Sequence, residues 1–350
     1  MIETDAVIIG AGPVGLYQAF QLGLLEIEAH LVDALPAVGG QCIELYPDKP
    51  IYDIPALLEC SGRSLAEQLL AQIQPFGQPI HLGQLLSSLT SKEDGWFELI
   101  TSTGTAFTAK AVFIAAGVGA FQPRTLKVEG LEAFNGSQLL HHTPALDALA
   151  DQHVAVFGDD ELALQEALSL ASATGLMRPA SVTLIHRRDA FTAEAATVTR
   201  LRAACAARQM SFIAAQPIGI ETQAGRLTHL HLACADDSTR LLPVGTVLAL
   251  LGLSPKLGPI AEWGLAMARK QLVVDAAQFQ TSVAGIYAVG DINTYPGKRK
   301  LITCGFHEAT LAAYAAAQRL QGGAPVAQQY TTTSPRLQQL LGRVPGNAAR

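Results

Sequence analysis

Three glycines near the start of the chain follow one another at spacings of two and three residues. They are Gly10, Gly12 and Gly15, and they come directly after the apolar residues 6–9. Gly10 permits a tight turn, Gly12 lets the backbone approach a pyrophosphate because it has no Cβ, and Gly15 allows a helix to pack closely on a strand. The helix that follows offers unpaired N–H groups and the positive end of its dipole to phosphate oxygens. This spacing indicates a site for a dinucleotide.

An acidic residue lies at the distance from these glycines that such a site requires. Residues 16–25 have the pattern of a helix, and the short strand 29–32 is followed by Asp33. A carboxylate about twenty residues after the glycines accepts hydrogen bonds from ribose hydroxyls. The alternative is an ordinary strand–helix–strand unit with a glycine turn. Strand, glycines, helix and acid together favour dinucleotide binding.

A glycine- and proline-rich stretch, residues 35–55, comes next and has no helical or strand period, which predicts a loop. Within it, Gly40 would let the backbone lie against a cofactor, and Gln41 would hydrogen-bond a ring edge. Tyr46 or Tyr52 would stack on the same ring. Long loops in compact domains are often functional, although a proline-rich connector remains the alternative.

A second strand–turn–helix pattern begins at residue 153. Its strand ends at Gly158, but Asp160 stands where the middle glycine belongs. A Cβ at this position blocks the approach of a pyrophosphate, and the carboxylate repels it. The next strand ends at Arg187 and Arg188, which match the arginines that bind the 2′-phosphate of NADP, with a solvated strand end as the alternative. Half of a nucleotide site is therefore present, and the other half is altered.

The remaining chain completes two α/β domains. Residues 80–116 alternate like a β-meander and end in an apolar strand that returns to the first sheet. Residues 285–291 form another apolar strand that ends at Asp291, just before a helical segment, which puts an acid on the ligand-binding edge of the sheet. We predict an α/β fold of two Rossmann-like dinucleotide-binding domains: a discontinuous first domain, residues 1–117 and 253–350, and a second domain, residues 118–252.

The composition excludes several classes of protein. The 350 residues carry a net charge of −6, which gives no sign of nucleic-acid binding. No apolar run approaches the roughly eighteen residues of a membrane span. Glu3 and Asp5 stand where a signal peptide carries positive charge, so we expect a cytoplasmic protein. The cysteines have no CxxC motif or metal-ligand spacing, so we expect no disulfide framework and no metal site; they are Cys42, Cys60, Cys205, Cys234 and Cys304.

Several longer strings resemble a known family over nearly the whole chain. GAGPVG, VGGQC with YPDKPIYDIP, AAG at residues 115–117, HRRDAF, AVGDINTYPGKRK and CGFHEA together resemble the thioredoxin-reductase-like ferredoxin–NADP reductases. The resemblance implies a homodimer with FAD on the first domain and NADPH on the second. It also implies hydride transfer from NADPH to the flavin and single-electron transfer to ferredoxin or flavodoxin. Because the chemistry belongs to FAD, no catalytic side chain is expected.

The resemblance further implies which residues contact FAD. Tyr46 would stack on the flavin ring. Residues 329–342 of the partner subunit would cover the other face of the ring, through Tyr330 or one of the threonines that follow, such as Thr332. The positions that match the family's other FAD contacts are Asp33, Gln41, Leu86, Phe121 and Asp291.

The second glycine turn departs from this family. Asp160 replaces its middle glycine, Asp159 and Glu161 add negative charge, and Thr192 stands where the family has arginine. Three interpretations follow. The chain is a ferredoxin–NADP reductase with weakened affinity for NADPH, a flavoprotein reductase that uses another donor such as ferredoxin itself, or an FAD-binding regulatory or scaffold protein without enzymatic activity.

A run of basic residues follows Asp291. Lys298, Arg299 and Lys300 would form a positive patch that steers an acidic ferredoxin toward the protein. A solvated loop with no such role is the alternative.

Overall fold

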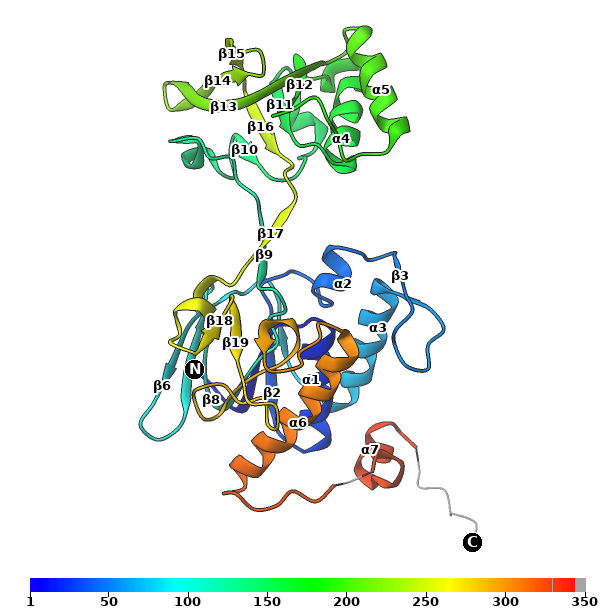
Figure 1. Cartoon of the computed structure of the whole chain (residues 1–350), viewed down its shortest axis with the longest axis vertical. Coiled ribbons are helices and arrows are strands. Elements are labelled where there is room, and N and C mark those ends of the chain that lie inside the picture. Colours follow the sequence, from blue (N-terminus) through cyan, green and yellow to red (C-terminus); the bar gives the residue numbers. More distant parts are fainter. Residues whose placement is uncertain (329, 344–350) are drawn as a thin grey trace. The chain divides into compact units, whose positions relative to one another are not determined.

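The structure is a computed structural model that describes residues 1–328 and 330–343, with only the backbone described at residues 120–122, 176, 253 and 255. The chain divides into two compact units (Figure 1). The first unit comprises Met1–Ala120 and Pro255–Arg350, and the second comprises Phe121–Ser254. The sequence places these boundaries after residues 117 and 252. Where the chain passes from one unit to the other, β9 (Ala120–Pro123) and β17 (Leu253–Lys256) pair with each other.

The first unit is built on a sheet with the strand order β5-β2-β1-β8-β7-β6, in which β20 also pairs with β8. The parallel pairing aligns Ile9 of β1 with Val32 of β2 and with Ile114 of β8, so three strands end at the same edge of the sheet. The antiparallel meander that the sequence predicts over residues 80–116 is formed by β6, β7 and β8, whereas residues 80–81 form a separate strand parallel to β2. The strands are β1 (Ile2–Ile9), β2 (Ala29–Val32), β5 (Ile80–His81), β6 (Leu86–Ser91), β7 (Phe97–Thr101), β8 (Ala106–Ile114) and β20 (Ile286–Ala288).

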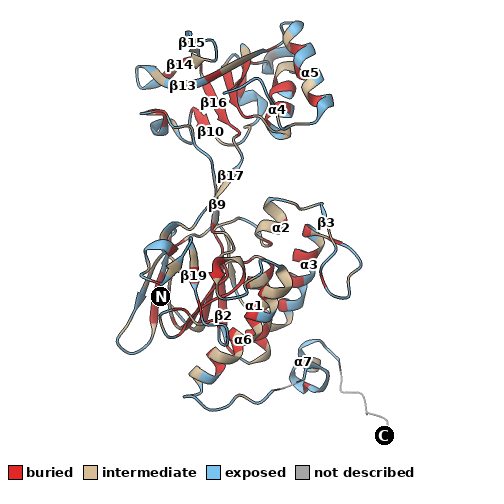
Figure 2. Ribbon diagram, in the orientation of Figure 1, coloured by how far each residue is buried: buried red, intermediate tan, exposed pale blue. Residues whose placement is uncertain are grey.

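Three helices cover this sheet, and α1 (Pro13–Leu24) packs against both α3 (Gly62–Ile73) and α6 (Ile302–Leu320). The buried face of α6 consists largely of alanines, which let it approach α1 closely. Figure 2 shows the buried residues concentrated in the sheet and on the inner faces of these helices. Two short helices, α2 (Gln41–Glu44) and α7 (Pro335–Leu340), belong to the same unit.

The second unit repeats the parallel architecture. Its sheet has the order β10-β16-β11-β12-β13-β14-β15, with β10, β16, β11, β12 and β13 parallel and β14 and β15 as an antiparallel extension. Separate apolar clusters fill the two faces of the sheet. The elements are β10 (Leu139–Leu140), β11 (His153–Phe157), α4 (Glu161–Ser172), β12 (Ser181–His186), α5 (Ala195–Ala206), β13 (Ser211–Gln223), β14 (Arg226–Cys234), β15 (Thr239–Pro243) and β16 (Thr246–Ala249).

Small sheets complete the first unit. One is the antiparallel pair of β3 and β4. In the other, β19 pairs with β18 in the antiparallel direction and with β21 in the parallel direction. Among the described residues, no helix combines the length and the hydropathy that a membrane span requires. The strands of these sheets are β3 (Pro50–Ile51), β4 (Cys60–Ser61), β18 (Met267–Ala268), β19 (Gln271–Val273) and β21 (Asn293–Thr294).

Candidate functional site

The first glycine turn leaves open space beside its middle glycine. Gly10 has a φ of +108°, and a Cβ there would come within 2.5 Å of the Ala115 carbonyl oxygen. A Cβ on Gly15 would overlap the carbonyl oxygen of Gly10. Gly12 is different, because its φ is −71° and, in the part of the chain that the structure describes, a Cβ there would meet only the Cα of Gly40, at 3.8 Å. Packing within the chain therefore explains Gly10 and Gly15, whereas the space beside Gly12 is free for a ligand.

The N-terminus of α1 faces this space without a capping side chain. Gly12 is the N-cap residue, and no side chain in the described part of the chain accepts a hydrogen bond from the first turn. Pro13 at the first helical position has no N–H to satisfy. The amides of Val14 and Gly15 are therefore available to an anion, which the helix dipole also favours.

Asp33 is bonded directly to the turn. Its Oδ2 accepts from the amide of Ala11 at 2.6 Å, and its Oδ1 accepts from the amide of Leu35 at 2.8 Å. Burial raises the pKa of the Asp33 carboxyl above its ordinary value, and the two backbone hydrogen bonds offset only part of this increase. A carboxylate oxygen has a second lone pair, so Asp33 can hold the turn and still accept a hydroxyl of a ligand.

The loop that the sequence places after Asp33 returns to the glycine turn. The amide of Gly39 donates to the carbonyl of Ala11 at 2.8 Å. Gln41, at the start of α2, donates from Nε2 to Asp291 Oδ2 at 3.4 Å. A Cβ on Gly117 would lie 3.1 Å from the same Nε2. The ends of β8 and β20 and the loop therefore meet beside the glycine turn, which argues against a simple connector.

The two candidate tyrosines of this loop differ in environment. Tyr46 is half-buried, and its hydroxyl lies 3.6 Å from the Sγ of Cys42. Burial, followed by the contact with Cys42, raises the pKa of Tyr46 well above its usual range. Tyr52 is 66 % exposed. Of the two, Tyr46 has the fixed position that stacking on a ring requires.

Leu86 is almost fully enclosed by the first unit. The residue is 2 % exposed, and its side chain belongs to the apolar core of this unit. The residues just before it are tied to the Asp33 loop, because Gly83 donates to the carbonyl of Leu35 at 2.8 Å and Gln84 to that of Asp33 at 2.9 Å. The side chain of Phe121 lies outside the described residues.

Thr332 belongs to a segment at the other end of α1. It is exposed in a short 3-10 helix, Thr331–Thr333, which precedes α7. Arg336 of α7 donates from Nη1 to the carbonyl of Gly23 at 2.9 Å, at the C-terminal end of α1. This end is opposite to the one that Gly12 caps.

The predicted basic patch is wrong in one of its three members. The Lys298 side chain is 8 % exposed and forms an ion pair with the fully buried Glu308 at 2.5 Å. Only Arg299 and Lys300 are exposed. Sequence reasoning missed Glu308, although a single acid on the alanine-rich face of α6 was a usable signal, because an unpaired carboxylate is rarely buried.

The second glycine turn is closed by its own side chain. Gly158 packs tightly, since a Cβ there would overlap Ala163 and the carbonyl oxygen of Leu250. Asp160 is the N-cap residue of α4, and its Oδ1 accepts from the amide of Ala163 at 3.0 Å. A carboxylate of the chain therefore already occupies the amide that a phosphate would use.

The neighbouring acids brace the turn against the loop after β12. Glu161 accepts from the amide of Glu194 at 2.8 Å and from Thr197 Oγ1 at 2.6 Å, so it holds the start of α5. Its pKa is lowered, first by the Thr197 hydrogen bond and then by that of the Glu194 amide. The carbonyl of Asp159 accepts from the amide of Thr192 at 2.8 Å. Glu161 and Asp159 therefore hold the loop after β12 in place, a structural role that their negative charge alone did not indicate in the sequence.

Arg187 and Arg188 are exposed directly after β12. Within residues 1–328 and 330–343, neither guanidinium has a hydrogen bond or ion pair, so both are free to bind an anion. Their loop is anchored farther along by Arg202, which pairs with Asp189 and lies 5.4 Å from the ring of Phe191.

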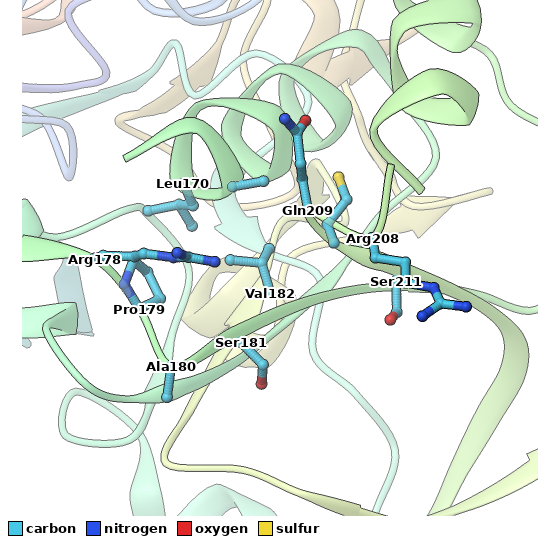
Figure 3. Close-up of a pocket in the computed structure, with 11 residues that line it drawn as sticks. Leu170, Arg178, Pro179, Ala180, Ser181, Val182, Arg208, Gln209 and Ser211 are labelled. Carbon is cyan, nitrogen blue, oxygen red and sulfur yellow. The ribbon is translucent and has the colours of Figure 1, made fainter. Parts of the chain in front are cut away.

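Two other arginines mark the opposite edge of this sheet. Arg178 and Arg208 line a pocket at the starts of β12 and β13, together with Ser181 and Ser211 (Figure 3). Parallel α/β sheets bind ligands beyond the carboxyl ends of their strands. This pocket is therefore separate from the edge that carries Asp160 and Arg187.

Metal and disulfide sites are absent from the described part of the chain. No group of three or more ligating side chains there could hold a metal ion. All five cysteines are free, with Cys205 in α5 and Cys234 at the end of β14.

Solved structures share this fold. Thioredoxin reductase from Lactococcus lactis matches with a TM-score of 0.56 and 22% identity, covering 91% of this chain and 99% of that chain. The bacillithiol disulfide reductase from Staphylococcus aureus matches with a TM-score of 0.59 and 16% identity, covering 92% and 99%. At these identities the likeness concerns the fold alone, and it confirms the predicted α/β class with two Rossmann-like domains.

Sequence comparisons give the family. A family model described as pyridine nucleotide-disulphide oxidoreductase matches residues 4–319. A ferredoxin–NADP reductase from Albidiferax ferrireducens is 55% identical over 97% of this chain and 96% of the relative, and one from Methylibium petroleiphilum is 52% identical over 97% and 93%. Together with the glycine turns and the fold, these matches establish that the chain belongs to the pyridine nucleotide-disulphide oxidoreductase family and, within it, to the thioredoxin-reductase-like ferredoxin–NADP reductases.

Proposed function

We propose that this protein is a ferredoxin–NADP(+) reductase that uses FAD to pass electrons between NADPH and ferredoxin or flavodoxin. The observation that carries the proposal is the 55% identity to a ferredoxin–NADP reductase over 97% of the chain. The open space beside Gly12 is the independent structural support, because among the described residues only the Gly40 Cα comes within 4 Å of a Cβ placed there. The chemistry that FAD supplies when bound is the conversion of a two-electron hydride donor into a source of single electrons.

The residues of the first unit have the chemistry to hold FAD. The uncapped amides of α1 and the glycine backbone at Gly12 and Gly40 would bind the pyrophosphate, and Asp33 would accept ribose hydroxyls. Gln41 and Asp291 would hydrogen-bond the flavin ring, and Tyr46 would stack on it. Leu86 and Phe121 would contribute further contacts.

The second unit would hold NADPH in part. Arg187 and Arg188 would bind the 2′-phosphate through charge-assisted hydrogen bonds. At the turn after Gly158, a pyrophosphate would have to displace the carboxylate of Asp160 from the amide of Ala163. We therefore propose that NADPH binds more weakly than at a turn with three glycines, while remaining preferred over NADH.

We also propose a homodimer. Thr332 and its neighbours precede a helix that is bound to the C-terminal end of α1, opposite to Gly12. This placement suits a segment that covers the flavin of a partner subunit. Arg299 and Lys300 would attract an acidic redox partner. The cytoplasmic location that Glu3 and Asp5 indicate stays a prediction.

One observation favours a second candidate function. Because Asp160 already caps α4, the second unit is complete without a nucleotide. The protein would then be an FAD-binding flavoprotein that takes electrons from another donor, or a binding protein without enzymatic activity.

Anaerobic titration of the FAD-loaded protein with NADPH separates the two candidates. A ferredoxin–NADP reductase should lose its flavin absorbance as NADPH is added, at an excess over the flavin because the nucleotide binds weakly, and should then reduce added ferredoxin. Loss of absorbance with reduced ferredoxin but not with NADPH would favour the second candidate. A purified protein that is colourless and takes up no FAD would contradict both.

A further inference from the structure

We infer that Glu308 and Lys298 are positioning residues for the flavin: their buried ion pair holds the Gly290–Asp291 turn in the one conformation that presents Asp291 at the site. The inference rests on the proposed function, because it concerns the FAD site. It goes beyond that function by assigning a role to two side chains that act on Asp291 through the backbone of Gly290 and not by contact with the flavin.

Glu308 is the acceptor for a closed set of hydrogen bonds. It is 0 % exposed, on the buried face of α6. Its Oε2 accepts from the amide of Gly290 at 2.7 Å and from Asn293 Nδ2 at 2.9 Å. Its Oε1 accepts from the Tyr295 hydroxyl at 2.9 Å and from Lys298 Nζ at 2.5 Å. All four donors come from the segment 290–298, so one carboxylate fixes that whole segment.

Gly290 is held at both of its polar groups. Its amide donates to Glu308, and its carbonyl accepts from Lys298 Nζ at 2.8 Å. Its φ is +80°, and a Cβ there would press on Val14 at 3.3 Å. A Cβ on Gly305 would overlap Val14 as well. The turn is thus confined between the first turns of α1 and α6, and Asp291 follows it directly.

Stability alone does not explain this arrangement. A buried ion pair gains little over well-packed apolar residues, because the desolvation of both charges offsets their attraction. What the pair provides is geometry, since each carboxylate oxygen takes two donors in fixed directions. The same turn carries the Asp291 carboxylate, which meets Gln41 at 3.4 Å. If the Gly290–Asp291 turn were mobile, Asp291 and Gln41 would leave their positions beside the glycine turn. Part of the binding free energy of FAD would then be used to bring these two side chains back.

Two single variants and their combination test the role. In Glu308→Gln one oxygen and one NH₂ group replace two oxygens, so two of the four donors lose their acceptor. In Lys298→Met the cation and the bond to the Gly290 carbonyl are lost. In the double variant the glutamine oxygen can serve Gly290 and Asn293 while its NH₂ group faces the Tyr295 oxygen, so this variant should bind FAD better than Glu308→Gln alone.

The measurements are the dissociation constant of FAD on the apoprotein, the absorption spectrum of the bound flavin and the melting temperature of the apoprotein. We expect Glu308→Gln to weaken FAD binding by about tenfold or more. When FAD brings the turn back to its wild-type conformation, buried donors remain without an acceptor, and their desolvation makes the free energy of binding less favourable. The flavin spectrum should shift as well. Tyr295→Phe removes a single donor and gives a milder variant in case Glu308→Gln does not fold.

Leu99→Ala is the control for general instability. Leu99 is fully buried in β7, within the same core but on the meander. It should lower the melting temperature and leave the FAD affinity within about twofold of the wild type. If all the Glu308, Lys298 and Tyr295 variants bind FAD as the wild type does, or if Leu99→Ala weakens binding equally, the positioning role is refuted. A wild-type protein that binds no FAD would instead refute the proposed function.

Discussion

The two glycine turns occupy equivalent places in their units, yet they leave opposite states at the start of the helix. In the first turn the N-cap residue is Gly12, and the amide of Gly15, three residues on, has no side-chain acceptor. In the second turn the N-cap residue is Asp160, and the corresponding amide, that of Ala163, donates to its carboxylate. The N-terminus of α1 can therefore bind an external anion, whereas the N-terminus of α4 is already capped by a carboxylate of the chain.

The residues after the second strand of each unit show the same contrast. Asp33 accepts from the amide of Ala11 inside the first turn, and residues 10–15 themselves include no charged side chain. At the equivalent place His186, the last residue of β12, has its Nε2 3.8 Å from Asp159 Oδ2, beyond hydrogen-bond distance. The side chain that closes the second turn is that of Asp160, which accepts from the amide of Ala163. A turn that binds a ligand must leave its donors free, whereas a turn stabilised by the chain itself uses them. The stability that a ligand would add to the first turn is already present in the second.

Making the first turn resemble the second should have the largest effect. We expect Gly12→Asp to abolish FAD binding, because the new side chain fills the space beside Gly40 and repels the pyrophosphate by on the order of 1 to 4 kcal/mol at effective dielectrics of 80 to 20. Reconstitution of the apoprotein with FAD, followed by absorbance, measures the loss. The fold should survive, because aspartate is a favoured N-cap residue.

Gly12→Ala separates the two contributions to this loss, since it adds volume without charge. A Gly12→Asp protein that remains yellow with full FAD occupancy would show that the space beside Gly12 is not the pyrophosphate site.

Making the second turn resemble the first should have the next largest effect. We expect Asp160→Gly to tighten NADPH binding by about tenfold and to speed flavin reduction, because the Ala163 amide and the space beside it are released. The cost in stability should be only about 0.3 kcal/mol, since glycine is nearly as good an N-cap as aspartate. Stopped-flow reduction under anaerobic conditions measures both changes.

Asp160→Asn is the matched control, because it keeps the size and the cap and removes the charge. If neither variant gains affinity, NADPH does not use this turn, and the second candidate function takes precedence.

The arginines after β12 should affect selectivity more than rate. We expect Arg187→Ala to reduce the preference for NADPH over NADH by about tenfold, through loss of charge-assisted hydrogen bonds to the 2′-phosphate. The ratio of kcat/KM for the two nucleotides is the measurement. Arg178→Ala, at the opposite edge of the same sheet, should leave the ratio unchanged. An equal change in both variants would indicate a general charge effect instead.

The smallest expected difference between the two units is in how their stability changes at low pH. Burial lowers the pKa of His30 and His81, whose rings stack at 5.2 Å in the first unit, so the folded state binds fewer protons than the unfolded state near the ordinary value of 6.5. Their stabilising effect is therefore complete above pH 6.5 and is lost as the pH falls through their lowered pKa values. In the second unit the pKa of Glu161 lies below 4.5, so its contribution persists until the pH falls below that value.

Hydrogen exchange of peptides from β1 and β11, compared between pH 7.5 and 5.5, should show faster opening of β1 alone. His81→Gln should reduce the difference, because it removes one of the two titrating rings. Equal acceleration in both strands would contradict this assignment.

The architecture and the first site were predictable because they depend on local order in the chain. The spacing of Gly10, Gly12 and Gly15 indicates a strand–turn–helix unit by itself, although distant residues such as Ala115 and Gly40 also pack against the turn. The apolar run before Asp291 likewise predicted a parallel strand, since burial on both faces leaves this signature. Gln41 and Asp291 are 250 residues apart, but each follows from its own motif, and the sheet edge brings them together.

What only the tertiary structure decided are the partners of the charged groups. In the sequence, Lys298 is one of three adjacent basic residues and Glu308 is an acid in a helix, and no local pattern shows that they form a buried pair. In the sequence, Asp160 was interpreted only as a glycine replacement that blocks and repels a pyrophosphate, whereas in the structure its carboxylate also caps α4. A hydrogen bond depends on the direction of a side chain and on burial by distant elements, and neither is encoded in the spacing of residues. The sequence therefore determined where ligands can approach, and the packing of the folded chain decided which charges remain free to meet them.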